Sequence, residues 1–361
     1  MAFRFLTAGD IHLGRRPAGV PRDQDARDFA PRRAWEALVE TAISQAVDAI
    51  ALTGDIVDQD NRFYEALSDL QRGVQRLVGE GILVIAVAGN HDFEVLPRLA
   101  AQIDGFHLLG QGGTWESFTA SSSDGASVRF LGWSFPRQHV MNNPLDAFPS
   151  AQSNMPTVGL LHCDCHAQTS RYAPVRLIDL QSQEADVWAL GHIHAGGLLG
   201  NGKPAVFYPG SLQGLDPTEI GPHGAWLVTL GTGEPPRLEL QPLAALQWEH
   251  VVIPLDGAET DSAVEQAVTD AVRGVDQGVR TQSGRVRTVG CRFQFTGRTA
   301  MHRAMPSIAA RLTEDYKPSF EGVSYFVESV EDETRPDVGL EELARSKDPA
   351  GLLAQRLLVL D

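Results

Sequence analysis

Five short segments of the chain carry side chains of the types that can bind divalent metal ions. They are Gly9-Asp10-Ile11-His12, Gly54-Asp55, Gly89-Asn90-His91-Asp92, Leu161-His162 and Gly191-His192-Ile193-His194. On an extended strand, side chains two positions apart point the same way. The Asp-x-His and His-x-His pairs can therefore each direct both side chains at a single ion.

The candidate ligands combine imidazoles, carboxylates and one amide. They are Asp10, His12, Asp55, Asn90, His162, His192 and His194. This mixture suits Mn²⁺, Fe²⁺ or Zn²⁺ better than Ca²⁺. Because seven ligands exceed what one ion takes from a protein, we expect two ions, about 3.5–4 Å apart, that share one carboxylate. We expect Asp55 to be that bridge.

A pair of divalent ions favours hydrolysis of phosphate esters. A water between the ions has a lowered pKa and can attack phosphorus, while the cations neutralise the charge that builds on the phosphoryl oxygens. His91 adjoins Asn90 and is not needed as a ligand, so we expect it to be the catalytic residue that protonates or stabilises the leaving oxygen. We expect Asp92 to cap a helix over Phe93–Ala101.

Each motif has a plainer explanation when it is taken alone. A single Asp-x-His pair means little, and a lone His162 is more often a core histidine. The whole set, at the ends of strands, favours the metal site. His162-Cys163-Asp164-Cys165-His166 resembles a zinc cluster but lacks a second pair at zinc-finger spacing. The chain has no Gly-x-Ser-x-Gly elbow and no P-loop, which disfavours serine-based acyl transfer and ATP hydrolysis.

Strand-like and helix-like segments alternate over the first part of the chain, where apolar spacing predicts a parallel sheet built from βαβ units. The predicted strands there are Phe3–Ala8, Ala49–Thr53 and Ile82–Ala88, and the predicted helices are Arg32–Val47 and Phe63–Val78. Further strands are expected at Thr114–Ala120, Ser127–Phe135, Thr157–His162, Val187–Gly191, Ala205–Tyr208 and Ala225–Leu230. The metal-binding segments follow strands, where sites gather in open α/β sheets.

A second, smaller α+β region follows Pro235-Pro236 and Pro242. Its predicted strands are Val251–Leu255, Thr288–Thr296 and Val323–Val330, and its predicted helices are Asp261–Arg273 and Ser307–Tyr316. We therefore expect a catalytic domain over 1–242, a second domain over 245–332, and a tail over 333–361 with one short helix. A chain of 361 residues agrees with about two domains.

Composition limits the classes of protein that the chain can represent. No apolar run reaches the roughly 20 residues of a membrane helix, so no membrane partner is expected. The N-terminus lacks the apolar region of a signal peptide, and the three cysteines are too few for a disulfide framework. These features predict a cytoplasmic protein.

The charge is unevenly distributed. The net charge of −16 argues against a simple nucleic-acid binder. Arg273–Lys317, however, holds nine basic and three acidic residues, a net +6, which leaves −22 elsewhere. This stretch either contacts phosphates or is a solvated surface, and both interpretations stay open.

The motifs resemble those of the calcineurin-like metallophosphoesterase superfamily, and more closely those of the SbcD/YhaO-type DNA repair exonucleases. The segments that resemble this branch are Asp10-Ile11-His12-Leu13-Gly14, Gly54-Asp55-Ile56-Val57-Asp58, Trp188-Ala189-Leu190-Gly191-His192-Ile193-His194, Tyr208-Pro209-Gly210-Ser211-Leu212-Gln213-Gly214 with Glu219, and Thr296-Gly297-Arg298-Thr299 with Met301-His302. The resemblance covers nearly the whole chain and is most specific in the metal motifs.

The resemblance implies an α/β fold, a four-layer α/β/β/α sandwich with two mixed sheets, followed by a smaller C-terminal α+β capping domain. It implies Mn²⁺-dependent cleavage of DNA, with Fe²⁺ or Zn²⁺ as alternatives, by a homodimer that works with an SbcC-like coiled-coil ATPase. By the same analogy, one metal takes Asp10, His12, Asp55 and His194, and the other takes Asp55, Asn90, His162 and His192.

The chain departs from some relatives at two places. Where they carry a histidine three positions after the second-motif aspartate, this chain has Asp58. The tail also ends where partner-binding helices often follow. Two other functions remain open: a small-molecule phosphodiesterase or phosphatase with the same metals, and a non-catalytic scaffold for an ATPase.

Overall fold

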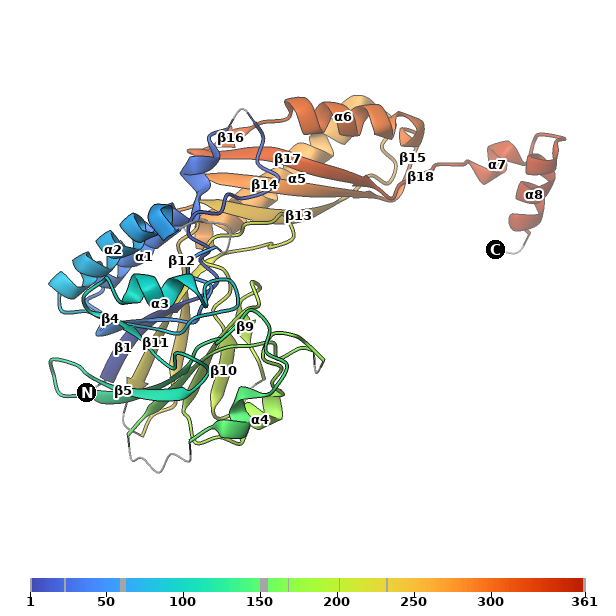
Figure 1. Ribbon diagram of the computed structural model, residues 1–361. Helices are drawn as coiled ribbons and strands as arrows, with labels where there is room; N and C mark the ends of the chain where they lie inside the picture. Colours follow the sequence, from blue (N-terminus) through green and yellow to red (C-terminus); the bar gives the residue numbers. More distant parts are fainter. Residues whose placement is uncertain are drawn as a thin grey trace. The chain divides into compact units, whose positions relative to one another are not determined.

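The computed structural model describes residues 2–22, 24–58, 63–149, 155–167, 169–200, 202–231, 233–282 and 284–359. The chain divides into two compact units (Figure 1). The first unit comprises residues 1–248 and 282–287, and the second comprises 249–281 and 288–361. The last two residues of the expected tail lie outside the described part.

The first unit contains two six-stranded sheets, of which one runs in the order β12-β11-β1-β2-β3-β4. Its strands are β1 (Ala2–Ala8), β2 (Ala49–Leu52), β3 (Leu83–Ala86), β4 (Phe106–Leu108), β11 (Gly224–Gly231) and β12 (Arg237–Pro242). β1 to β4 are parallel, which confirms the predicted βαβ core, and β11 and β12 add antiparallel strands at one edge. The sequence did not suggest β4 or β12.

The helices of the first sheet cover its outer face (Figure 1). They are α1 (Pro31–Ser44), α2 (Phe63–Gly79) and α3 (Val95–Ala100). Side chains alternate along β1, so that Leu6 and Ala8 join the core under the helices while Phe3 and Phe5 point to the other side. β1 therefore contributes apolar side chains to the cores on both of its faces.

The second sheet runs in the order β5-β6-β7-β8-β10-β9. Its strands are β5 (Trp115–Ser121), β6 (Ser127–Trp133), β7 (Thr157–His162), β8 (Val187–Gly191), β9 (Gly197–Leu198) and β10 (Ala205–Tyr208). Phe3 and Phe5 of the first sheet share one buried cluster with Phe130 and Phe207 of the second. The opposite face of the second sheet packs against loops and the short helix α4 (Leu177–Gln181). The expected four-layer α/β/β/α sandwich is confirmed.

The second unit is a smaller α+β domain, as expected. Its four-stranded sheet has the order β13-β14-β17-β16. The elements are β13 (Leu246–Pro254), α5 (Asp261–Gln282), β14 (Thr288–Thr296), α6 (Met305–Asp315), β16 (Ser319–Phe320), β17 (Val323–Asp332), α7 (Leu340–Leu343) and α8 (Pro349–Leu357), with a short ladder of β15 (Arg298–Thr299) and β18 (Arg335–Pro336). No helix in the described ranges has both the length and the apolar character to cross a membrane.

Helix α5 extends nine residues beyond its predicted end at Arg273. The buried positions Val272, Asp276 and Val279 continue its inner stripe. Gly274 and Gly278 lie in this extension with open space around them. Glycine costs about 1 kcal/mol in a helix, and burial of the stripe offsets that cost here.

Gly159 of β7 offers a test of the packing in the second sheet. It lies opposite Trp188 of β8, and a Cβ at this position would overlap the buried indole ring. We expect Gly159→Ala to lower the free energy of unfolding by about 1–3 kcal/mol, because overpacking a rigid core forces neighbours to shift. Urea denaturation measures the change. Gly79→Ala, at the exposed end of α2 with open space around it, is the matched control and should leave stability equal or slightly higher. Equal stability of both variants would contradict the packing argument.

Candidate metal centre

The first two metal-binding loops leave neighbouring parallel strands and remain hydrogen-bonded to one another. The Asp10 N–H donates to the Gly54 carbonyl oxygen (3.1 Å), and the His12 N–H donates to the Asp55 carbonyl oxygen (2.9 Å). Asp10, His12 and Asp55 all have positive φ, at 48°, 50° and 49°. Non-glycine residues rarely adopt this region, and each instance costs about 1–3 kcal/mol. The loops therefore hold these side chains in turns that the free chain would avoid.

Most of the glycines beside these residues leave room for neighbouring loops, and only some of them adopt a backbone conformation that favours glycine. Gly54 has a φ of 96°, in the left-handed region that favours glycine. Gly89 and Gly191 do not have positive φ, but a Cβ would overlap the Asp55 carboxylate at Gly89 and the Thr53 carbonyl at Gly191. The empty Cβ positions let the loops approach one another closely.

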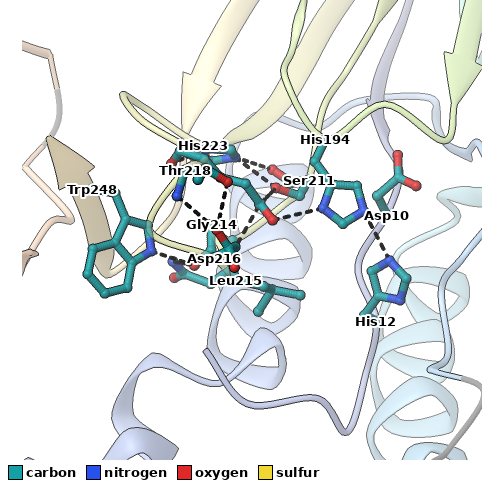
Figure 2. Close-up of polar contacts among 12 residues, drawn as sticks. Asp10, His12, His194, Ser211, Gly214, Leu215, Asp216, Thr218, His223 and Trp248 are labelled. Atoms are coloured by element: carbon teal, nitrogen blue, oxygen red, sulfur yellow. Dashed lines mark hydrogen bonds and ion pairs between the residues drawn. The ribbon is translucent and has the colours of Figure 1, made fainter. Parts of the chain in front are cut away.

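Asp10, His12 and His194 form one group with ligand atoms within 4.8 Å of one another. The Nε2 atoms of His12 and His194 face each other at 3.3 Å, and Asp10 lies beside them (Figure 2). Two imidazole nitrogens and a carboxylate are all able to donate lone pairs to a cation. This group has the chemistry of a metal site.

Asp10 also belongs to a second group, with Asp55 and His162. The Nδ1 of His162 lies 3.0 Å from the Thr53 carbonyl oxygen, which can only accept a hydrogen bond, so Nδ1 donates. Its Nε2 then faces the Asn90 Oδ1 at 3.0 Å and the Asp55 Oδ2 at 3.3 Å. The His162 Nε2, the Asn90 Oδ1 and the Asp55 Oδ2 all carry lone pairs, and one cation placed among them could accept all three.

The protonation of His162 reflects the same demand for positive charge. Burial alone disfavours the imidazolium, yet Asp55 and Asp10 raise the pKa of His162 to about 9. In the absence of a metal ion, a proton supplies the charge that the carboxylates require. A divalent ion would displace that proton, since metal ligands bind in their deprotonated forms.

His192 lies beside these groups but belongs to none of the metal-binding groups found among the described residues. The backbone N–H of His192 donates to both carboxylate oxygens of Asp10, each at 3.1 Å. The centroid of the His192 ring is 5.4 Å from that of the His162 ring. Burial, together with the neighbouring His162, lowers the pKa of His192 to about 4. The ring is thus neutral at pH 7, the form that ligates metals.

His91 belongs to a third group, together with His12 and Asp58. The Asp58 Oδ1 lies 3.6 Å from the Nδ1 of His12 and 3.7 Å from the Nδ1 of His91. The His91 N–H donates to the Asp55 Oδ1 at 2.8 Å, which fixes its backbone against the second group. Its side chain is 36% exposed, and burial of the rest lowers its pKa. His91 therefore shares His12 with the first group, and its ring is accessible to a substrate.

Asp92 does not cap a helix, and that expectation is wrong. Helix α3 begins at Val95, and Glu94 occupies the N-cap position. The fully buried Asp92 carboxylate instead accepts hydrogen bonds from the N–H groups of Ile56 and Gly89, both at 2.7 Å. Burial, and then the charge of Asp55, raise the pKa of Asp92 to about 7. The side chain joins the loops that carry Asp55 and Asn90.

The Cys-x-Cys segment does not form a separate metal cluster within the part of the chain that the structure describes. Cys163 and Cys165 are free thiols, and burial raises the pKa of both. His166 stacks on Tyr208. Tyr208 in turn donates to the Cys163 carbonyl oxygen and accepts from the Cys165 N–H, both at 2.9 Å.

Glu219 is an interacting residue to which the sequence assigned no role. Its Oε1 accepts from the Nδ1 of His194 at 2.9 Å, on the side of the ring away from His12. Burial opposes ionisation, but His194 and Ser211 lower the pKa of Glu219 to about 2. The only signal in the sequence was its place after the Tyr208–Gly214 segment.

Comparison with known proteins agrees with this geometry. Residues 3–196 match the family model described as calcineurin-like phosphoesterase, which is more than half of the chain. The chain belongs to the calcineurin-like phosphoesterase family. Residues 248–335 match the model of the YhaO metallophosphoesterase middle domain. The SbcD/YhaO-type resemblance and the prediction of a metal-dependent phosphoester hydrolase are confirmed at the level of the family.

Two curated relatives are similar over much of the chain. The uncharacterized metallophosphoesterase YhaO of Bacillus subtilis is 30% identical over 74% of this chain and 66% of the relative. The DNA double-strand break repair protein Mre11 of Aeropyrum pernix is 30% identical over 65% of this chain and 60% of the relative. The chain thus spans about two thirds or less of the length of these relatives.

A solved structure, TT1561 of Thermus thermophilus, aligns with this chain with a TM-score of 0.44 and 14% identity. The alignment covers 67% of this chain and 100% of the solved chain.

The two groups that contain Asp10 allow a test of which carboxylate bridges. Sequence reasoning chose Asp55, whereas the structure places Asp10 in both groups and Asp55 in one. We expect both Asp55→Asn and Asp10→Asn to lower the Mn²⁺ retained per chain after dialysis, because an amide oxygen cannot replace a shared charge. Elemental analysis measures the retained metal, and the variant that loses both equivalents carries the bridge. Asp104→Asn, at an exposed position, is the control. Full retention of two equivalents by both site variants would contradict the two-metal arrangement.

Proposed function

We propose that this protein is a two-metal phosphodiesterase that cleaves DNA. The observation that carries the proposal is the convergence of lone-pair atoms from Asp10, His12 and His194, with the Nε2 atoms of the two histidines 3.3 Å apart. The similarity to a protein named for repair of DNA double-strand breaks supports DNA as the substrate.

The proposed ligands combine the two groups with the family resemblance, from which come Asn90, His192 and the sharing of Asp55. Asp10, His12 and His194 would hold one ion, and Asn90 and His162 would hold the other, with Asp55 shared. His192 completes the second set from beside His162. Mn²⁺ is the proposed ion, with Fe²⁺ and Zn²⁺ as alternatives, since imidazole, carboxylate and amide ligands suit each of them. When bound, such a pair would lower the pKa of a water and neutralise phosphoryl charge.

The residues around the ligands have separate tasks in the proposed reaction. His91 protonates or hydrogen-bonds the leaving oxygen, which its exposed ring can reach. Asp58 lies at the Nδ1 of His91 and orients the ring. Asp92 holds together the two loops that supply Asp55 and Asn90, through the N–H groups of Ile56 and Gly89.

The distribution of charge favours a second candidate, a phosphodiesterase for small molecules. Three arginines of the basic stretch are paired within the second unit: Arg280 with Asp276 at 3.0 Å, Arg292 with Glu328 at 3.1 Å, and Arg311 with Glu265 at 3.1 Å. Paired arginines contribute less to phosphate contacts than free ones. Together with the net charge of −16, this supports a small ester as the alternative substrate.

The remaining parts of the proposal concern partners and location. The family resemblance suggests a cytoplasmic homodimer that acts with an SbcC-like coiled-coil ATPase. Among the described residues, α8 exposes Leu352, Leu353 and Leu357, which would suit an apolar contact with a protein.

The substrate can be decided directly. We expect the Mn²⁺-loaded protein to release nucleotides from labelled single- or double-stranded DNA, because the family site attacks phosphodiesters. A chromogenic phosphodiester, bis(p-nitrophenyl) phosphate, is assayed in parallel. Cleavage of the chromogenic ester without any cleavage of DNA would favour the small-molecule candidate, and cleavage of neither would favour a scaffold.

The role of His91 has its own test. We expect His91→Ala to bind two Mn²⁺ ions normally and to lower turnover by about 10²-fold or more, as for the loss of a general acid. Metal analysis and initial rates measure the two effects. The exposed His250→Ala is the matched control and should retain full activity. Unchanged turnover in His91→Ala would remove this residue from the mechanism.

A further inference from the structure

Behind His194 lies a chain of hydrogen bonds that the metal groups do not include. The Nδ1 of His194 donates to the Glu219 Oε1 at 2.9 Å. The other carboxylate oxygen, Oε2, accepts from the Ser211 hydroxyl at 2.7 Å and from the Leu215 N–H at 3.1 Å. Figure 2 shows Ser211 and His223 on the side of His194 that faces away from His12. Both carboxylate oxygens are therefore occupied by donors.

The Glu219 carboxylate determines the direction of the contact with Ser211. A carboxylate can only accept, so the Ser211 hydroxyl donates its proton to Oε2. His223 borders the same contact: its Nδ1 lies 2.9 Å from both the carbonyl and the hydroxyl oxygen of Ser211, and its Nε2 lies 3.1 Å from the Glu219 carbonyl oxygen. His223 thus joins the segment that carries Ser211 to the segment that carries Glu219. His223 is 6% exposed and Ser211 fully buried, so water cannot easily replace either side chain.

The contact with Glu219 determines the protonation of the other ring nitrogen of His194, Nε2. A carboxylate can only accept, so the Nδ1 of His194 must carry the proton in this contact. The Nε2 then keeps its lone pair, and it is this atom that faces the Nε2 of His12 at 3.3 Å. A hydrogen bond on one ring nitrogen sets which nitrogen can bind a metal.

We propose that Glu219, held by Ser211 and His223, is the positioning residue that fixes His194 with Nε2 directed at the metal group. This inference rests on the proposed two-metal function, because it assigns a role relative to one of its ligands. Glu219 itself contacts no substrate. It acts through His194, and its effect is expected at the ion that His194 binds and not at the ion near His162 and Asn90.

Calorimetric titration of the metal-free protein with Mn²⁺ tests the assignment. Glu219→Gln keeps the shape of the side chain but offers one oxygen in place of two, so it cannot accept from both His194 and the donors on its other side. We expect one of the two Mn²⁺ affinities to fall by about 10- to 100-fold, as is typical for loss of a carboxylate behind a ligating histidine, while the other stays within about twofold. Glu184→Gln removes an equal charge at an exposed site and should change neither affinity.

A spectroscopic readout separates positioning from a general structural role. In Zn²⁺-loaded protein with ¹⁵N-labelled histidine, we expect the His194 signals, identified with His194→Gln, to show a protonated Nδ1 and a metal-bound Nε2. If Glu219→Gln does not fold, Ser211→Ala provides the weaker version, with a smaller loss at the same ion. Metal bound through Nδ1 of His194, or two unchanged affinities in a folded Glu219→Gln, would overturn the inference alone. A wild-type protein that binds no divalent ion would instead overturn the proposed function.

Discussion

The structure depends on a concentration of hydrogen-bond acceptors and negative charge at the ends of parallel strands. Asp10 and Asp55 are almost fully buried, and within the described part of the chain the positive charge near them comes from histidines. Burying carboxylates without a neutralising charge is expensive, and the raised pKa of His162 shows how the protein responds when only protons are available. A divalent ion would neutralise the same carboxylates. The arrangement therefore has the charge and the acceptors that a metal site requires.

The fold supplies the rigidity that such a site needs. The candidate ligands follow the carboxyl ends of β1, β2 and β3 in one sheet and of β7 and β8 in the other. The loops after β1 and β2 are hydrogen-bonded to each other. Asp10, His12, Asp55 and His192 have positive φ, which costs free energy that the large apolar cores on either side can offset. Strain of this kind fixes the side-chain directions before any ion binds. The cost of organising the ligands is thus met during folding and not during metal binding.

The sequence predicted the strands that carry the candidate ligands, because buried strands depend on short-range pattern. In Asp-x-His and His-x-His, the spacing of two positions alone indicates that both side chains point the same way on a strand. The buried strands are recognised by their mostly apolar sequences. What could not be predicted depends on contacts between distant positions. The carboxylate of Asp92 looked like a helix cap, since it precedes a helical segment, but its donors are the N–H groups of Ile56 and Gly89. Likewise, nothing local in the sequence pairs Glu219 with His194, 25 positions earlier. The end of α5 was missed because burial of Val279 outweighs two glycines.

Five acidic residues around the centre show how environment divides one chemical group among several tasks. Asp10 and Asp55 each accept from one backbone N–H and also face the other candidate ligands, so their carboxylates can contribute to the proposed cation sites. Asp92 is equally buried, but both of its oxygens accept from the backbone N–H groups of Ile56 and Gly89, so this side chain joins loops. Asp58 and Glu219 lie at the Nδ1 atoms of histidines whose Nε2 atoms point inward. A carboxylate placed behind an imidazole raises its basicity and fixes its orientation, whereas one placed in front competes with it for the cation. The position of each acid relative to the histidines, and not its distance from the centre alone, therefore decides whether it binds the ion or directs the residue that does.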